Sequence, residues 1–283
     1  MNNPATAMPP PPPGAPAAMP PPPPGAPAPA VAAARSFAIT SGRIEGAQRI
    51  VIYGPGGIGK STLASLAPGS VILDIEEGTR EINASRIEGI ETFEDLRACL
   101  RSDALDGCGT VVIDSATKAE EMALAHALKT VTHEKGNHVD NIEGYGFGKG
   151  YIHVYDTFLL LLQELDAQIR KGRNVILVAH ECVETVPNPL GEDWIRYEPH
   201  LQSPKSGKAS IRHRVKNWAD HVLFVGYDVV ADEGKGRGGG TRTIYPAELP
   251  THIAKSRVLP PSPLPFAGAN DDSVWRLMFG GAQ

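Results

Sequence analysis

Short apolar runs alternate with longer stretches of helical spacing along most of the chain. The runs with the length and β-branched content of buried strands are Arg49–Tyr53, Val71–Asp74, Thr110–Asp114, Asn174–Ala179 and His221–Val225. Helical stretches lie between them: one capped by Thr92 and running past Cys99, one from about 116 to 131, and one from about 151 to 171. This alternation predicts an α/β domain with a mostly parallel sheet and helices on both faces.

The pattern changes toward both ends of this region. Ser36–Thr40 is expected to form an edge strand. Beyond Tyr227 the chain is expected to form a hairpin with the flexible tip Gly234–Gly240. The segment Asp271–Phe279 is expected to be a helix that packs Val274, Trp275 and Met278 onto the body.

The first 34 residues differ from the rest in composition. They carry no charged side chain, and a Met-Pro-Pro-Pro-Pro-Pro-Gly-Ala-Pro-Ala sequence begins at both Met8 and Met19. Proline runs favour an extended polyproline II tether and cannot build a core. We therefore expect a disordered arm at 1–34, favoured as a spacer over a docking element for a proline-reading partner, and one folded domain at 35–283.

Composition sets limits on the class of protein. The 283 residues are 41% hydrophobic and 21% charged with a net charge of −5, enough for one sizeable core. The longest apolar run, Phe158–Leu162, is too short to span a bilayer, and no secretory signal is visible. Three cysteines without paired spacing indicate reduced thiols, and hence a cytoplasmic protein. The mild acidity leaves room for a local nucleic-acid surface.

A glycine-rich loop follows the first strand of the body. It fits the G-x-x-x-x-G-K-[ST] pattern of a phosphate-binding P-loop, through Gly54, Pro55, Gly56, Gly57, Ile58, Gly59, Lys60 and Ser61. Such a loop points backbone N–H groups at phosphate oxygens, and the helix that begins near Lys60 adds its positive end. Lys60 is expected to reach the β- and γ-phosphates of ATP, Ser61 to offer its hydroxyl to Mg²⁺, and Thr62 to support the α-phosphate.

Polar residues follow three of the other strands, where ligands of open α/β sheets bind. Asp114 ends a buried run and is expected to hold Mg²⁺, the alternative being an aspartate that caps the next helix. Glu76 could polarise the attacking water, with Glu77 and Asp74 as rivals and a solvated acidic turn as the plain alternative. His180 follows the fourth strand and is favoured as a γ-phosphate sensor over a structural histidine.

These segments resemble those of a known family. Tyr53–Thr62, Leu73–Glu76, Val111–Ser115, Val178–His180 and Trp218–Val225 are similar, in order and spacing, to phage-type RecA-like ATPases, which include single-strand-annealing recombinases with a minimal RecA core. The likeness covers roughly residues 50–260. It implies a RecA-like P-loop NTPase core and a phage-encoded protein. Because no standard N-terminal oligomerisation domain is apparent, annealing is expected rather than full strand exchange.

The resemblance also implies roles for single residues. It prefers Glu76 over Glu77 as the residue that activates water, and it places His180 where classical RecA proteins have a glutamine that links the γ-phosphate to a DNA-binding loop. The segment Ala254–Pro260 resembles the family's Lys-x-Arg element. Lys255 and Arg257 would then reach the nucleotide of a neighbouring subunit, with an ordinary surface charge pair as the alternative.

A basic stretch between His200 and Trp218 contains no acidic residue. We expect it to grip the phosphates of single-stranded DNA through Lys205, Lys208, Arg212, Arg214 and Lys216. Trp194 and Tyr197 could stack on bases, and a second contact is expected from Lys235, Arg237 and Arg242. The loop Gly144–Gly150 is either a further DNA-facing element or a simple connection. A solvated basic face is the alternative for the whole surface.

Together these observations predict a DNA-stimulated ATPase that uses ATP and Mg²⁺, assembles with its own copies into a ring or filament, and anneals or recombines single-stranded DNA. A single-strand-binding protein is a candidate partner, and no membrane is expected. Two alternatives remain open: a P-loop kinase of a small molecule, and a nucleotide-dependent scaffold without significant hydrolysis.

Overall fold

The computed structural model describes residues 39–42, 44–205, 208–232 and 235–280. Its contacts define a compact unit that begins at Glu45. The proline-rich arm predicted at 1–34 lies outside the described residues, as do the first three residues of the edge strand expected at 36–40. Ile39 and Thr40 are described, are exposed and belong to no strand, so the strand prediction is wrong for these two positions.

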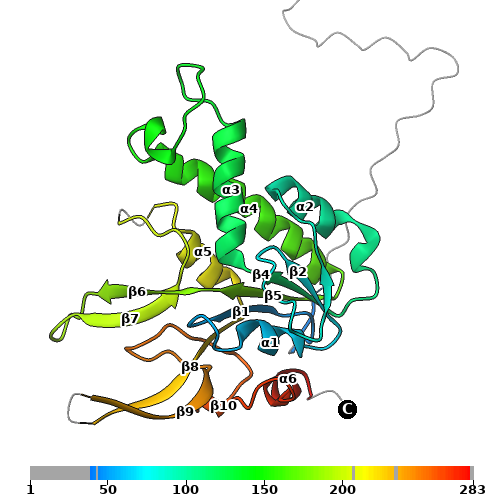
Figure 1. Ribbon diagram of the computed structural model, residues 1–283, viewed down its shortest axis with the longest axis vertical. Coiled ribbons are helices and arrows are strands. Elements are labelled where there is room, and N and C mark those ends of the chain that lie inside the picture. The colour runs from blue at the N-terminus through cyan, green and yellow to red at the C-terminus, as the bar shows by residue number, and fades with distance from the viewer. Residues whose placement is uncertain (1–38, 43, 206–207, 233–234, 281–283) are drawn as a thin grey trace, which may run out of the picture. The chain divides into compact units, whose positions relative to one another are not determined.

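An eight-stranded sheet forms the centre of this unit (Figure 1), in the order β10-β9-β8-β1-β5-β4-β2-β3. The strands are β1 (Arg49–Tyr53), β2 (Ser70–Asp74), β3 (Ser85–Ile87), β4 (Thr110–Asp114), β5 (Asn174–Ala179), β8 (His221–Asp232), β9 (Lys235–Tyr245) and β10 (Leu264–Pro265). All neighbours from β8 to β3 pair in parallel, whereas β9 and β10 add antiparallel strands. One strand, β5, lies between the strand that feeds the P-loop and the strand that ends at Asp114.

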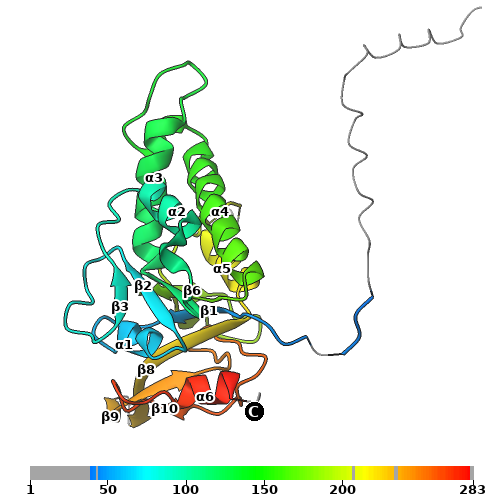
Figure 2. The same cartoon turned by 90° about the vertical axis from the view of Figure 1, so that its right-hand side faces the viewer.

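Helices cover both faces of the sheet (Figure 2). One face carries α2 (Phe93–Arg101), α3 (Ala116–Thr130), α4 (Lys149–Arg170) and α5 (Ile211–Trp218), whose buried residues form one core with the inward side chains of the sheet. The other face carries α1 (Lys60–Ser65) and α6 (Ser273–Phe279) over a second core. The Trp275 indole donates a hydrogen bond of 2.8 Å to the Leu63 carbonyl, which fastens α6 to α1.

Local sequence explains these elements. Strand β4 is buried at every position, as expected for a strand covered on both faces. Thr92 caps α2, as the sequence predicted, and it does so in a reciprocal capping box with Asp95. Helix α4 buries Val154, Phe158, Leu161 and Leu165 at helical spacing, and each such side chain contributes about 1.5–3 kcal/mol when removed from water.

Two hairpins extend from the carboxyl edge of the sheet (Figure 1). The first, β6 (Glu181–Val186) with β7 (Trp194–Pro199), follows β5 directly and was not predicted. The second, β8 with β9, was predicted beyond Tyr227. The predicted flexible tip, Gly234–Gly240, is wrong for residues 235–240, which belong to strand β9 and of which 235–238 pair with β8, while Gly234 lies outside the described residues.

The mostly parallel sheet, the helices on both of its faces and the C-terminal hairpin confirm the predicted α/β architecture. Within the described ranges, no helix is long and apolar enough to cross a membrane.

Candidate functional site

The P-loop connects β1 to α1 and depends on glycine for its path. A Cβ on Gly54 would lie 2.0 Å from the Val225 carbonyl oxygen of the neighbouring strand, so no other residue fits there without moving β8. Gly59 precedes α1 with a φ of 103°, a conformation that favours glycine. The loop is therefore wedged against the sheet and turns sharply into the helix.

Lys60 is held inside this loop. Its ammonium group donates to the carbonyl oxygens of Gly54 at 2.7 Å and Pro55 at 2.8 Å. Burial lowers the pKa of Lys60, and the carboxylates of Glu181, Asp114 and Glu76 act in the opposite direction. An ammonium group held at the mouth of a P-loop is suited to bind phosphate oxygens.

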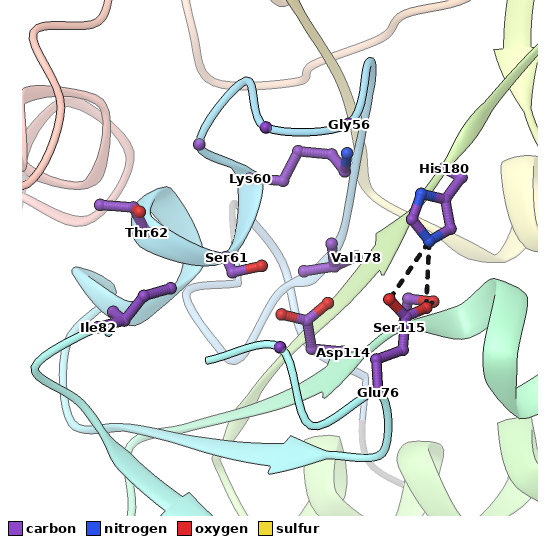
Figure 3. Close-up of a pocket in the computed structure, with 13 residues that line it drawn as sticks. Gly56, Lys60, Ser61, Thr62, Glu76, Ile82, Asp114, Ser115, Val178 and His180 are labelled. Atoms are coloured by element: carbon purple, nitrogen blue, oxygen red, sulfur yellow. Dashed lines mark hydrogen bonds and ion pairs between the residues drawn. The ribbon is translucent and has the colours of Figure 1, made fainter. Parts of the chain in front are cut away.

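A cavity of about 310 Å³ opens beside the loop. As Figure 3 shows, Lys60 and Ser61 line it from α1, Asp114 from the end of β4, Glu76 from the turn after β2, and His180 from the end of β5. These five sequence-predicted residues therefore lie in one place, and Gly56, Gly57, Gly59 and Thr62 line the same cavity. The strand register explains this, because β1, β5, β4 and β2 end level with one another.

The residues at the floor of the cavity fit a magnesium ion. Asp114 is 6% exposed, and burial raises the pKa of this carboxyl to about 6, with the Ser61 hydroxyl acting in the opposite direction. A carboxylate and a hydroxyl are the hard oxygen ligands that Mg²⁺ takes beside substrate phosphates. In the described part of the chain, no group of three or more His, Cys, Asp or Glu side chains could hold a metal by itself. Water molecules or phosphate oxygens would complete the shell of a magnesium ion here.

Glu76 and His180 contact each other at the rim of the cavity. The His180 Nε2 lies 3.1 Å and 3.3 Å from the two Glu76 carboxylate oxygens, and the Ser115 hydroxyl also donates to this carboxylate (Figure 3). Nε2 is therefore the protonated nitrogen of the ring. The backbone N–H of His180 donates to the Thr117 hydroxyl at 3.1 Å, which fixes the histidine against the start of α3.

The two rivals of Glu76 are engaged elsewhere. Asp74 is 2% exposed and accepts hydrogen bonds from the backbone N–H groups of Gly78 and Thr79, both at 3.1 Å, and from the Thr79 hydroxyl. It therefore closes the turn after β2. Glu77 is exposed and pairs with Arg80 at 3.0 Å. Neither lines the cavity.

Sequence reasoning missed two residues of the site. Ser115 bonds Glu76, and Glu181 is the first residue of β6 and the leading acidic contribution to the pKa of Lys60. Both directly follow residues that the sequence singled out, Asp114 and His180, which is the signal that could have found them.

The predicted DNA contacts fall into two groups. Lys205, Lys208 and Arg214 are exposed, and Lys216 pairs with Glu248 at 3.2 Å. Arg212 is 6% exposed and donates to Glu184 at 2.8 Å, Glu198 at 2.9 Å and the Leu201 carbonyl at 3.1 Å. The structure thus contradicts the prediction of Arg212 as a DNA contact, because its charge is buried and paired where it fastens α5 to the β6–β7 hairpin.

The other predicted contacts are spread over the unit. Lys255 pairs through its backbone with Val222 near the start of β8, and Arg257 lies 3.5 Å from Asp220. Both residues therefore lie at the amino ends of the parallel strands, whereas the P-loop lies at their carboxyl ends. Within one chain they do not reach the cavity. Arg242 lies beside Gly59 of the P-loop.

The comparisons with known proteins agree with a P-loop domain. A family model described as "AAA domain" matches residues 46–258. No curated protein matches the chain. A solved structure, that of the KaiC-like protein PH0186 from the hyperthermophilic archaeon Pyrococcus horikoshii OT3, is 15% identical with a TM-score of 0.39, covering 78% of this chain and 85% of that one. A similarity this distant carries no argument about this chain.

Proposed function

Because the chain belongs to the AAA domain family and holds a P-loop nucleotide site, we propose that it is an ATPase that binds ATP with Mg²⁺, hydrolyses ATP, and promotes annealing or recombination of single-stranded DNA in the manner of phage recombinases. It does so as a homo-oligomer in which Lys255 and Arg257 approach the nucleotide of the next copy. The observation that carries the hydrolytic part is the contact between Glu76 and His180 at the rim of the cavity.

Each residue of the cavity has a task in this proposal. The P-loop amides and Lys60 bind phosphate oxygens, while Ser61 and Asp114 would hold Mg²⁺. Bound Mg²⁺ neutralises negative charge on the phosphates. The Glu76 carboxylate orients the attacking water and accepts its proton. The His180 Nε2–H holds this carboxylate in place and responds to the presence of a γ-phosphate.

The DNA part of the proposal relies on cations that are exposed to solvent. Lys205, Lys208 and Arg214 are exposed beside α5, which follows the β6–β7 hairpin that begins next to His180. A protein of net charge −5 needs such a local cluster to attract phosphates.

The test is ATP hydrolysis with and without single-stranded DNA, for wild type, Lys60→Ala and Glu76→Gln, with Glu77→Gln as the matched control. We expect DNA to stimulate hydrolysis in wild type and the control. Lys60→Ala should lose ATP binding, and Glu76→Gln should keep ATP binding but lose about 10²-fold or more in turnover.

Other outcomes would reject parts of the proposal. If Glu76→Gln hydrolyses ATP at the wild-type rate, Glu76 has no catalytic role. If single-stranded DNA neither binds nor stimulates ATP hydrolysis, the proposed action on DNA is rejected. Transfer of the phosphoryl group to a nucleoside would mean a small-molecule kinase.

A further inference from the structure

A second pocket, which we call the aromatic pocket, lies next to the P-loop and outside the nucleotide cavity. It has a volume of about 470 Å³ and is lined mainly by Tyr197 of β7, Phe224 and Tyr227 of β8, Tyr245 of β9 and His252, with Pro55 at its border. The strands that supply it belong to the two hairpins at the carboxyl edge (Figure 1). None of its lining residues lines the nucleotide cavity.

The rings of this pocket are arranged as a stacking platform. The planes of Tyr197 and Phe224 are 14° apart with centroids at 5.4 Å, and those of Phe224 and His252 are 22° apart with centroids at 4.9 Å. A Cβ on Gly226 would lie 2.8 Å from the Phe224 ring, so the glycine leaves room for it. Tyr197 remains 41% exposed, which leaves aromatic surface open to a ligand.

The pocket also holds a polar group without a partner. His252 is 3% exposed, its Nδ1 lies 3.1 Å from the Thr251 hydroxyl, and its buried Nε2 has no hydrogen-bond partner among the described residues. Burial lowers the pKa of His252, and the Ala247 backbone and the Glu248 carboxylate act in the opposite direction. A buried polar atom of this kind is costly unless a ligand satisfies it.

A flat ring with polar edge atoms satisfies both features, since it can stack on the aromatic surface and pair with the imidazole nitrogen. We propose that the aromatic pocket binds a nucleobase, and that this base is one unstacked from the single-stranded DNA of the proposed function, on which the inference rests. Base stacking on aromatic side chains is a sequence-tolerant way of holding single strands.

The base of a nucleotide held by the P-loop is the less suitable occupant. Tyr53 and Phe224 belong to the core on the α3 and α4 face, whereas α1, which continues from the P-loop, packs on the other face. The pocket therefore opens on the side away from α1.

The test measures binding of two single strands of equal length and charge, a 20-mer of deoxythymidine and a 20-mer of abasic residues, in the full chain. We expect wild type to bind the thymidine strand at least about 5-fold more tightly, because stacking contributes that much per base. Tyr197→Ala should remove this preference, and Tyr197→Phe should retain it. Leu277→Ala, which truncates an exposed apolar side chain on α6, is the control and should behave as wild type.

ATP affinity, measured on the same variants, identifies the source of the base. If Tyr197→Ala weakens ATP binding and leaves both strands unaffected, the inference of a DNA base is overturned. If wild type binds both strands equally, the inference is wrong while the DNA-binding proposal stands. If neither strand binds, both are rejected.

Discussion

Replacement of Asp114 by asparagine is expected to stabilise the nucleotide-free protein at neutral pH while it weakens the binding of Mg²⁺ and ATP. Burial raises the pKa of this carboxyl from 3.8 to about 6, so the folded state resists its ionisation. At about 1.4 kcal/mol for each pKa unit, this difference corresponds to about 3 kcal/mol of lost stability. An asparagine has the same shape and no charge, so it escapes this penalty.

The sign of the pH dependence follows from the same values. Below about pH 4 the carboxyl is protonated in both the folded and the unfolded state, so it does not lower the free energy of unfolding. Between about pH 4 and 6 the folded state keeps a proton that the unfolded state loses, so stability falls as the pH rises. Above about pH 6 the carboxyl is ionised in both states, and the whole loss of about 3 kcal/mol in stability is present. The advantage of Asp114→Asn should therefore be largest at pH 7.5 and shrink toward pH 4.

Urea unfolding at pH 7.5 and pH 4.5, without nucleotide or Mg²⁺, measures this difference. Asp74→Asn is the matched control, since Asp74 pairs in register with Asp114 on the adjacent strand but accepts three hydrogen bonds. It should lose about 1–3 kcal/mol, because an amide nitrogen cannot accept them. The reasoning is refuted if Asp114→Asn is less stable than wild type at pH 7.5, or if its advantage is independent of pH.

Three further changes separate structural from surface residues. Gly54→Ala should cost at least about 2 kcal/mol and abolish nucleotide binding, because its Cβ would meet the Val225 carbonyl; an unchanged melting temperature would contradict this. Arg212→Ala should cost about 1–3 kcal/mol in urea unfolding, since it removes the partner of the buried Glu198 Oε2 while Arg196 still pairs with Oε1, and a loss below 1 kcal/mol would argue against the ion pair. Arg214→Ala should leave stability within about 0.5 kcal/mol of wild type and reduce the salt dependence of DNA affinity by about one ion, whereas an unchanged slope would exclude it as a contact.

The sheet could be predicted because its strands are buried on both faces. Such strands are continuous apolar runs, and the bounds expected for β4 and β5 agree with the structure. The P-loop could be predicted because its chemistry depends on neighbouring residues. The meeting of Glu76 with His180, 104 positions apart, follows from parallel strands ending at one edge. Their roles in hydrolysis stay predictions.

The β6–β7 hairpin could not be predicted because it projects from the sheet and gives no continuous apolar run. Its attachment depends on Arg212, whose partners lie 28 and 14 positions away on β6 and β7. The same distant partners explain the wrong prediction for Arg212, since a sequence shows a basic residue but not the carboxylates that surround it.

The lateral ends of the main sheet limit how copies of this chain can associate. The outermost strands are β3, with three residues, and β10, which has two residues and includes a proline without a backbone donor. Short edges of this kind offer few free backbone groups, which protects a sheet against joining another sheet side by side. Among the described strands, β6 and β7 are longer and border no further strand. Strand β9 pairs with β10 only at Thr243 and Ile244. Assembly of copies should therefore use side-chain surfaces or the open edges of the two hairpins, and not the short strands β3 and β10.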